Sequence, residues 1–147
     1  MATHRPLGYT LLELTLVLVL AGTLLGVAVP RGAAVLDRIA VTVARDIVAA
    51  SLARTRALAI SRGGATLVLR RRPLRLRIED ATGTLAPGGN PALPHGIELE
   101  TSGTDAEIQI RYDALGIGRL ASRTLRFRRG DAVATLVLSS YGRVTRQ

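Results

Sequence analysis

The sequence contains no cysteine, no lysine and only two histidines, His4 and His95. Without cysteine there is neither a disulfide framework nor thiol chemistry. The two histidines are far apart and have no cysteine partners, so zinc-binding spacing is absent, and no glycine-rich phosphate loop precedes a helix. Asp80, Asp105 and Asp113 lack the dense acidic loop that a calcium site needs. The sequence therefore predicts a non-enzyme that holds no metal and no cofactor.

The length of the chain limits its fold, and its net charge bears on the kind of partner it binds. The chain has 147 residues, which is enough for one small domain and a long helix. All 20 basic residues are arginine, and the net charge is +9. Such a charge suits an anionic partner, either nucleic acid or phospholipid head groups, but it is also typical of a solvated basic surface. Charge alone does not choose between these interpretations.

An apolar segment runs from Tyr9 to Val29, and Glu13 is its only charged residue. As a helix, its 21 residues extend about 31 Å, close to the thickness of a bilayer's hydrocarbon core. A cleaved secretory signal would have a shorter apolar core, whereas this one continues to Val29. A plain single-pass anchor would leave Glu13 unexplained, because a charge kept in hydrocarbon is costly and usually functional.

The motif Gly8-Tyr9-Thr10-Leu11-Leu12-Glu13, followed by this apolar run, resembles the class III signal of type IV prepilins and type II secretion pseudopilins. The resemblance implies that residues 1–8 are a leader and that a prepilin peptidase cuts between Gly8 and Tyr9. It also implies that Tyr9 becomes N-methylated and that Glu13 meets the N-terminal amine of a neighbouring subunit during assembly. Tyr9 replaces the more usual phenylalanine and keeps the aromatic ring.

After a transmembrane segment over residues 9–29, residues 30–62 are expected to continue the helix as an amphipathic segment. Paired glycines at 63 and 64 predict its end. Two apolar stripes follow the helical period. The first contains Leu36, Ile39, Val43, Ile47 and Ala50, and the second contains Val41, Val48, Leu52 and Ala59. Two stripes indicate two partners, the chain's own domain and neighbouring subunits; the alternative is that both stripes pack into one core.

Residues 65–147 change to the alternating pattern of half-buried strands. The expected strands are 66–70, 74–79, 97–101, 107–112, 124–128, 132–139 and 143–146. Residues 80–96 are rich in glycine and proline and predict a long surface loop. The fold class is therefore α+β, with a long N-terminal helix followed by an antiparallel β domain.

The β domain carries a second resemblance, to the GspH/FimT group of minor pseudopilins. The residues that carry it are 53–60 at the helix end, 125–131 in a strand and turn, and Ser139 to Arg143. The resemblance implies a single-pass protein of the bacterial inner membrane with a periplasmic C-terminal domain. Its implied partners are the prepilin peptidase, major and minor pseudopilins, the inner-membrane secretion platform and membrane lipid.

Two functions follow from these resemblances. The favoured one is a minor pseudopilin, a structural subunit of the type II secretion pilus that helps to export folded proteins across the outer membrane. The alternative is a FimT-like minor type IV pilin that binds DNA for uptake or assists pilus assembly, with Arg143 and Arg146 as the DNA-binding residues. DNA-binding members tend to end in Gly-Arg-x-Arg, whereas residues 142–146 here have one more residue between the arginines. In a strand this changes the face that Arg146 occupies, so nucleic acid is not the favoured partner. Arg126, Arg128 and Arg129 would join these two in one positive surface if the final strands form a hairpin.

Overall fold

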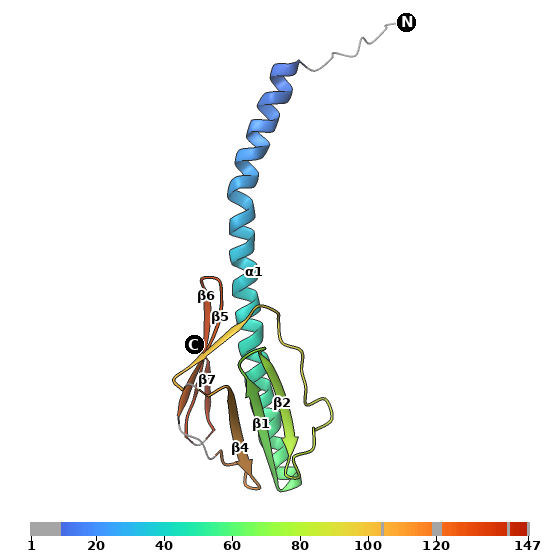
Figure 1. Cartoon of the computed structure of the whole chain (residues 1–147), viewed down its shortest axis with the longest axis vertical. Coiled ribbons are helices and arrows are strands. Elements are labelled where there is room, and N and C mark those ends of the chain that lie inside the picture. The colour runs from blue at the N-terminus through green and yellow to red at the C-terminus, as the bar shows by residue number, and fades with distance from the viewer. Residues whose placement is uncertain (1–9, 104, 119–121, 141, 147) are drawn as a thin grey trace, which may run out of the picture. The chain divides into compact units, whose positions relative to one another are not determined.

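The computed structural model describes residues 10–103, 105–118, 122–140 and 142–146. In these residues a single long helix precedes seven strands, and the helix followed by strands (Figure 1) confirms the α+β class. The elements are α1 (Leu11–Arg62), β1 (Gly64–Arg70), β2 (Arg75–Asp80), β3 (Glu98–Thr101), β4 (Glu107–Asp113), β5 (Arg123–Arg129), β6 (Ala132–Leu138) and β7 (Val144–Arg146). Every expected strand is present, with ends that differ by no more than two residues from the sequence prediction.

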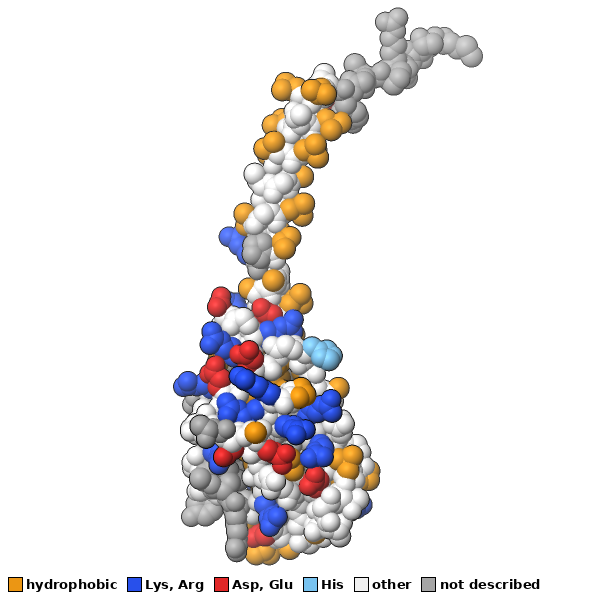
Figure 2. Space-filling model, viewed as in Figure 1, with side chains coloured by type: hydrophobic (Ala, Val, Ile, Leu, Met, Phe, Trp, Pro, Cys, Tyr) orange, Lys and Arg blue, Asp and Glu red, His pale blue; other side chains and the backbone are white. Residues whose placement is uncertain are grey.

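The chain divides into two compact units, Met1–Val35 and Leu36–Gln147. The described part of the first unit is helix α1, and its leucines and valines are exposed; Leu11, for example, is 86% exposed. Figure 2 shows hydrophobic side chains along this part of the helix. Its length and apolar composition are sufficient to cross a membrane. This segment is therefore a candidate membrane anchor.

The second unit contains the rest of α1 and two antiparallel sheets. One sheet has the strand order β2-β1-β4, and the other has the order β3-β5-β6-β7. In the first sheet Leu67 of β1 lies opposite Ile78 and Ile110, and all three side chains are buried. In the second sheet Leu125 lies opposite Leu136, and both are fully buried. Each sheet thus has one apolar inner face, as alternation along the strands requires.

Helix α1 and the inner faces of both sheets share one hydrophobic core. The second apolar stripe of α1 lies in it, because Val41, Val48, Leu52 and Ala59 are each at most 2% exposed. Burying a leucine or valine side chain contributes on the order of 1.5–3 kcal/mol. This stripe therefore holds the helix against the sheets.

The first stripe of α1 is left outside that core. Leu36, Ile39 and Val43 are 64%, 54% and 42% exposed, Ala50 is also exposed, and Ile47 is half-buried. The alternative that both stripes pack into one core is therefore wrong. We name Leu36, Ile39 and Val43 the free stripe.

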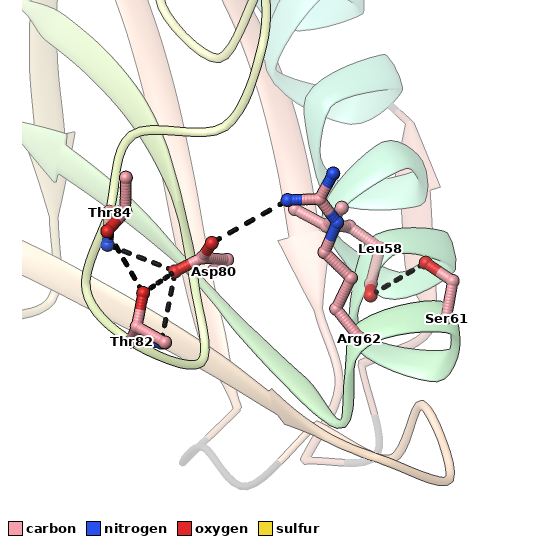
Figure 3. Close-up of polar contacts among 6 residues, drawn as sticks. All are labelled: Leu58, Ser61, Arg62, Asp80, Thr82 and Thr84. Carbon is pink, nitrogen blue, oxygen red and sulfur yellow. Dashed lines mark hydrogen bonds and ion pairs between the residues drawn. The ribbon is translucent and has the colours of Figure 1, made fainter.

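The C-terminal end of α1 is fixed to strand β2 by Asp80 (Figure 3). One carboxylate oxygen of Asp80 accepts hydrogen bonds from the backbone N–H of Thr82 and of Thr84, both at 3.0 Å, and from the Thr82 hydroxyl at 2.6 Å. The other oxygen lies 3.7 Å from a guanidinium nitrogen of Arg62. The hydroxyl of Thr82, with smaller contributions from the Thr84 and Thr82 amides and Arg62, lowers the pKa of Asp80 despite the opposing effect of desolvation.

The other two aspartates considered for calcium serve separate loops. Asp113 accepts hydrogen bonds from the backbone N–H of Leu115 at 3.0 Å and of Ile117 at 2.9 Å. Asp105 forms a salt bridge of 3.4 Å with Arg123. Asp80 and Asp113 therefore each stabilise a turn of the β domain, whereas Asp105 pairs with strand β5.

Candidate functional site

The first candidate site is the start of helix α1, where Glu13 lies in the first turn. The hydroxyl oxygen of Thr10 accepts a hydrogen bond from the backbone N–H of Glu13 at 3.2 Å, and its carbonyl accepts one from Leu14 at 3.2 Å. Thr10 is therefore the N-cap, and Glu13 occupies the position of the acidic residue in a capping box. The Glu13 side chain is exposed. A carboxylate here also interacts favourably with the helix dipole.

The proposed cleavage residues Gly8 and Tyr9 lie outside the described residues. The pairing of Glu13 with the amine of Tyr9 thus stays a prediction. The capping geometry offers a second, purely structural reason for a glutamate at position 13, and the two reasons differ in their chemical requirement. Capping needs only a hydrogen-bond acceptor, which glutamine also supplies, whereas pairing with an ammonium group needs the negative charge.

The second candidate site is the C-terminal turn that carries Arg143 and Arg146. The backbone N–H of Gly142 donates to the carbonyl of Ser139 at 2.9 Å, and Ser139 N–H donates to the carbonyl of Arg143 at 2.9 Å. Gly142 has a φ of +79°, and a Cβ there would lie 2.8 Å from Cε1 of Tyr112. Glycine is therefore required both by the turn and by the tyrosine ring beneath it.

Strand β7 places Arg146 on the inner face of its sheet. Arg146 lies opposite Leu136, which is fully buried, and directly opposite residues in an antiparallel ladder point to the same face. Its Nε lies 3.6 Å from Oδ1 of Asp46 in α1. Arg45 lies 3.0 Å from the same oxygen, so two guanidinium groups share one carboxylate.

An open groove with a volume of about 980 Å³ lies between helix α1 and the C-terminal segment. We call it the α1–β7 groove. It is lined by residues 142–146 and by Ala49, Leu52, Ala53, Arg56 and Tyr112. Arg143 and Arg146 both line this groove, so the structure brings the two predicted residues together. The groove combines an apolar wall of small side chains with a rim of three arginines.

Arg56 and Tyr112 were not identified from the sequence, yet both line the groove. Burial raises the pKa of the Tyr112 phenol, and the charge of Arg56 opposes that rise. Among the described residues, neither Arg56 nor Arg143 forms an ion pair with a carboxylate, whereas Arg146 is held by Asp46. The groove therefore presents uncompensated positive charge. No local motif marks these two residues, because they are far from residues 142–146 in sequence and only the topology joins them.

The arginines of β5 do not form one positive surface with Arg143 and Arg146. Arg128 lies 3.7 Å from Glu100 of β3, and Arg129 lies 2.9 Å from Asp37 of α1. Arg126 lies opposite Glu100 in the ladder. The final strands do form a hairpin, but Arg128 and Arg129 are paired with carboxylates there. That part of the sequence hypothesis is wrong, because alternation divides these arginines between the two faces of the sheet. Arg129 lies on the inner face, as Arg146 does, whereas Arg126 and Arg128 lie on the outer face.

The architecture is that of the pilin fold: one long N-terminal helix with an exposed apolar first part, followed by antiparallel sheets. A solved structure with this fold is the crystal structure of the type IV minor pilin FimU from Pseudomonas aeruginosa (strain PAO1). The similarity has a TM-score of 0.51, with 19% sequence identity, and covers 71% of this chain and 90% of that chain. No protein-family model matches the chain, and no curated protein matches its sequence. At this level of identity the likeness shows the pilin fold alone.

Proposed function

We propose that this chain is a minor pseudopilin, a structural subunit of the type II secretion pilus. The observation that carries the proposal is Glu13, a single carboxylate in the first turn of an exposed apolar helix within a pilin fold. A carboxylate near the hydrocarbon boundary costs on the order of 3 kcal/mol on insertion scales. An ammonium partner offsets much of that cost, and the amine of a mature chain that starts at Tyr9 is such a partner.

In this proposal the protein is a substrate of the prepilin peptidase and has no catalytic function of its own. The peptidase cuts the Gly8–Tyr9 bond, and Tyr9 is then N-methylated. The apolar segment anchors the chain in the bacterial inner membrane, with the β domain in the periplasm. The free stripe supports assembly with other major and minor pseudopilins, because it is apolar and the chain's own core does not cover it.

The test separates the two chemical roles of Glu13. Glu13→Gln keeps a capping acceptor but removes the charge, Glu13→Ala removes both, and Thr10→Ala removes only the cap. The measurement is in vivo crosslinking to the major pseudopilin in cells with a complete secretion system. We expect Glu13→Gln and Glu13→Ala to lose crosslinking equally, while Thr10→Ala retains it and all three are still cleaved and inserted. Crosslinking by Glu13→Gln at the wild-type yield would contradict the charge pairing.

The second candidate function is a FimT-like minor type IV pilin that binds DNA or assists pilus assembly. The observation that favours it is the α1–β7 groove, because Arg143 has no carboxylate partner among the described residues there. Phosphate contacts release counterions, so binding through the arginines would weaken steeply with salt. The pairing of Arg146 with Asp46 weighs against this function, since it neutralises one of the two residues on which DNA binding would depend.

A gel-shift titration with the full chain in neutral detergent distinguishes the two functions. The pseudopilin proposal predicts weak binding at physiological salt that is unchanged in Arg143→Ala/Arg146→Ala. Micromolar binding that the double substitution abolishes would replace the secretion proposal with the DNA one. Arg75→Ala/Arg77→Ala is the matched control, because it removes the same charge from strand β2.

A further inference from the structure

The outer edge of strand β7 has unpaired backbone groups. In the order β3-β5-β6-β7 this strand is at the end of the sheet and pairs only with β6. Ser139 N–H donates to the carbonyl of Arg143, so residues 139 and 143 form a hydrogen-bonded pair. Such pairs alternate along an antiparallel ladder, and the next one is Val137 with Thr145. The N–H and C=O of Val144 therefore point away from β6.

This free edge borders the α1–β7 groove, because residues 142–146 line it. Among the described residues, the backbone of Val144 makes no hydrogen bond on that side. An exposed strand edge is a template for another strand, and such strand addition combines main-chain hydrogen bonds with side-chain contacts on one face. The small side chains of Ala49 and Ala53 on α1 leave space for the side chains of an added strand.

The positive charge of the α1–β7 groove indicates what kind of ligand it binds. Arg56, Arg143 and Arg146 line the groove, and only Arg146 is paired, with Asp46. A ligand with carboxylates would compensate the positive charge of the two unpaired arginines. A second copy of the chain does not fit, because it carries a net charge of +9 and antiparallel β7–β7 pairing would bring four to six arginines together. The chain's own residues 1–9 carry His4 and Arg5 and no acidic residue, so they do not fit either.

We propose that the α1–β7 groove binds an extended acidic peptide segment of another protein, which adds to the sheet as a strand beside β7. The combination of a free strand edge with an apolar wall favours a peptide over nucleic acid. Nucleic acid can bind arginines through its phosphates, but it does not form a β ladder with the unpaired N–H and C=O of Val144. The proposal depends on this groove alone and holds whichever pilus system the chain serves.

The test uses the full chain in neutral detergent and a fluorescent, end-blocked octapeptide of alternating aspartate and valine. A second peptide has N-methyl groups on every residue, which removes the donors of both edges without changing its charge. A third has asparagine in place of aspartate, and a single-stranded oligonucleotide is the fourth probe. Fluorescence anisotropy should give micromolar binding of the first peptide only. Equal binding of the N-methylated peptide would overturn strand addition, and equal or tighter binding of the oligonucleotide would overturn the peptide proposal.

Two variants locate the binding on the protein. Val144→Pro removes the outward N–H and leaves the β6 ladder donors intact, so it should weaken binding at least about tenfold. Arg56→Ala/Arg143→Ala should weaken it by a similar factor, whereas Arg75→Ala/Arg77→Ala, outside the groove, should change it by less than about twofold. Thermal unfolding of each variant checks that it folds. Undiminished binding by a folded Val144→Pro variant would contradict the proposal, and so would equal loss in the β2 control.

Discussion

At the residue scale, the single carboxylate of Asp80 contacts both the turn after β2 and the end of helix α1. It accepts three hydrogen bonds from Thr82 and Thr84 and faces Arg62 at the end of α1. The sequence marked this residue only as the first of a glycine- and proline-rich loop and as a rejected calcium ligand. Its role as a turn acceptor could not be predicted with certainty, because many aspartates precede such loops without accepting several hydrogen bonds. Its carboxylate nevertheless connects the turn after β2 with Arg62 at the helix end.

The lowered pKa of Asp80 gives a prediction about pH. Because the folded-state pKa is below the unfolded value of about 3.9, this group stabilises the fold fully above that value. The stabilisation is lost as the pH falls from there towards the folded-state pKa. We expect Asp80→Asn to lower the unfolding temperature at pH 7 and to differ less from the wild type at pH 3. An equal difference at both pH values, measured by near-ultraviolet circular dichroism in detergent, would show that the carboxylate charge is not responsible.

At the element scale, helix α1 uses two faces for two purposes. The helical period of the sequence predicted both apolar stripes, and the structure assigns the one with Val41, Val48, Leu52 and Ala59 to the core. Periodicity alone could not make this assignment, because both stripes have similar composition. The distinction depends on where the two sheets lie, which is set by long-range pairing of strands.

A matched pair of leucine substitutions tests this division. Leu52 is 1% exposed and Leu36 is 64% exposed, although both lie on the same helix. Leu52→Ala should lower the free energy of unfolding by about 2–5 kcal/mol, because it leaves a cavity in the core. Leu36→Ala should change it by less than about 0.5 kcal/mol but should reduce crosslinking to other subunits. Chemical denaturation in detergent gives the first quantity. Similar stability losses in the two variants would contradict the assignment of the stripes.

The strands were predictable at this scale, but the groove was not. Alternation of apolar and polar residues defined each strand within two residues, because each sheet buries only one face. The α1–β7 groove instead combines Arg56 of the helix, Tyr112 of β4 and residues 142–146. No sequence pattern connects these three segments. Their proximity follows from the order of strands in the two sheets, which a single sequence does not specify.

At the scale of the whole molecule, we propose a processed, membrane-anchored subunit. The long apolar helix and the α+β class were both evident in the sequence, and the pilin fold agrees with them. The motif from Gly8 to Glu13 carries the rest of the proposal, because we propose that it contains the cleavage site. The fold is compatible with several pilus systems, so processing and assembly decide the function.

The most direct measurement is the intact mass of the full-length protein extracted from membranes of cells that contain a prepilin peptidase. We expect a mature chain that starts at Tyr9 and carries one methyl group on its amine. Gly8→Val should remain uncut, because a bulkier residue does not fit at the cleaved position, while Ala2→Val, elsewhere in the leader, should be cut normally. A wild-type chain that remains whole, or one that starts at any residue other than Tyr9, would contradict the proposal that this protein is a pilin-like subunit.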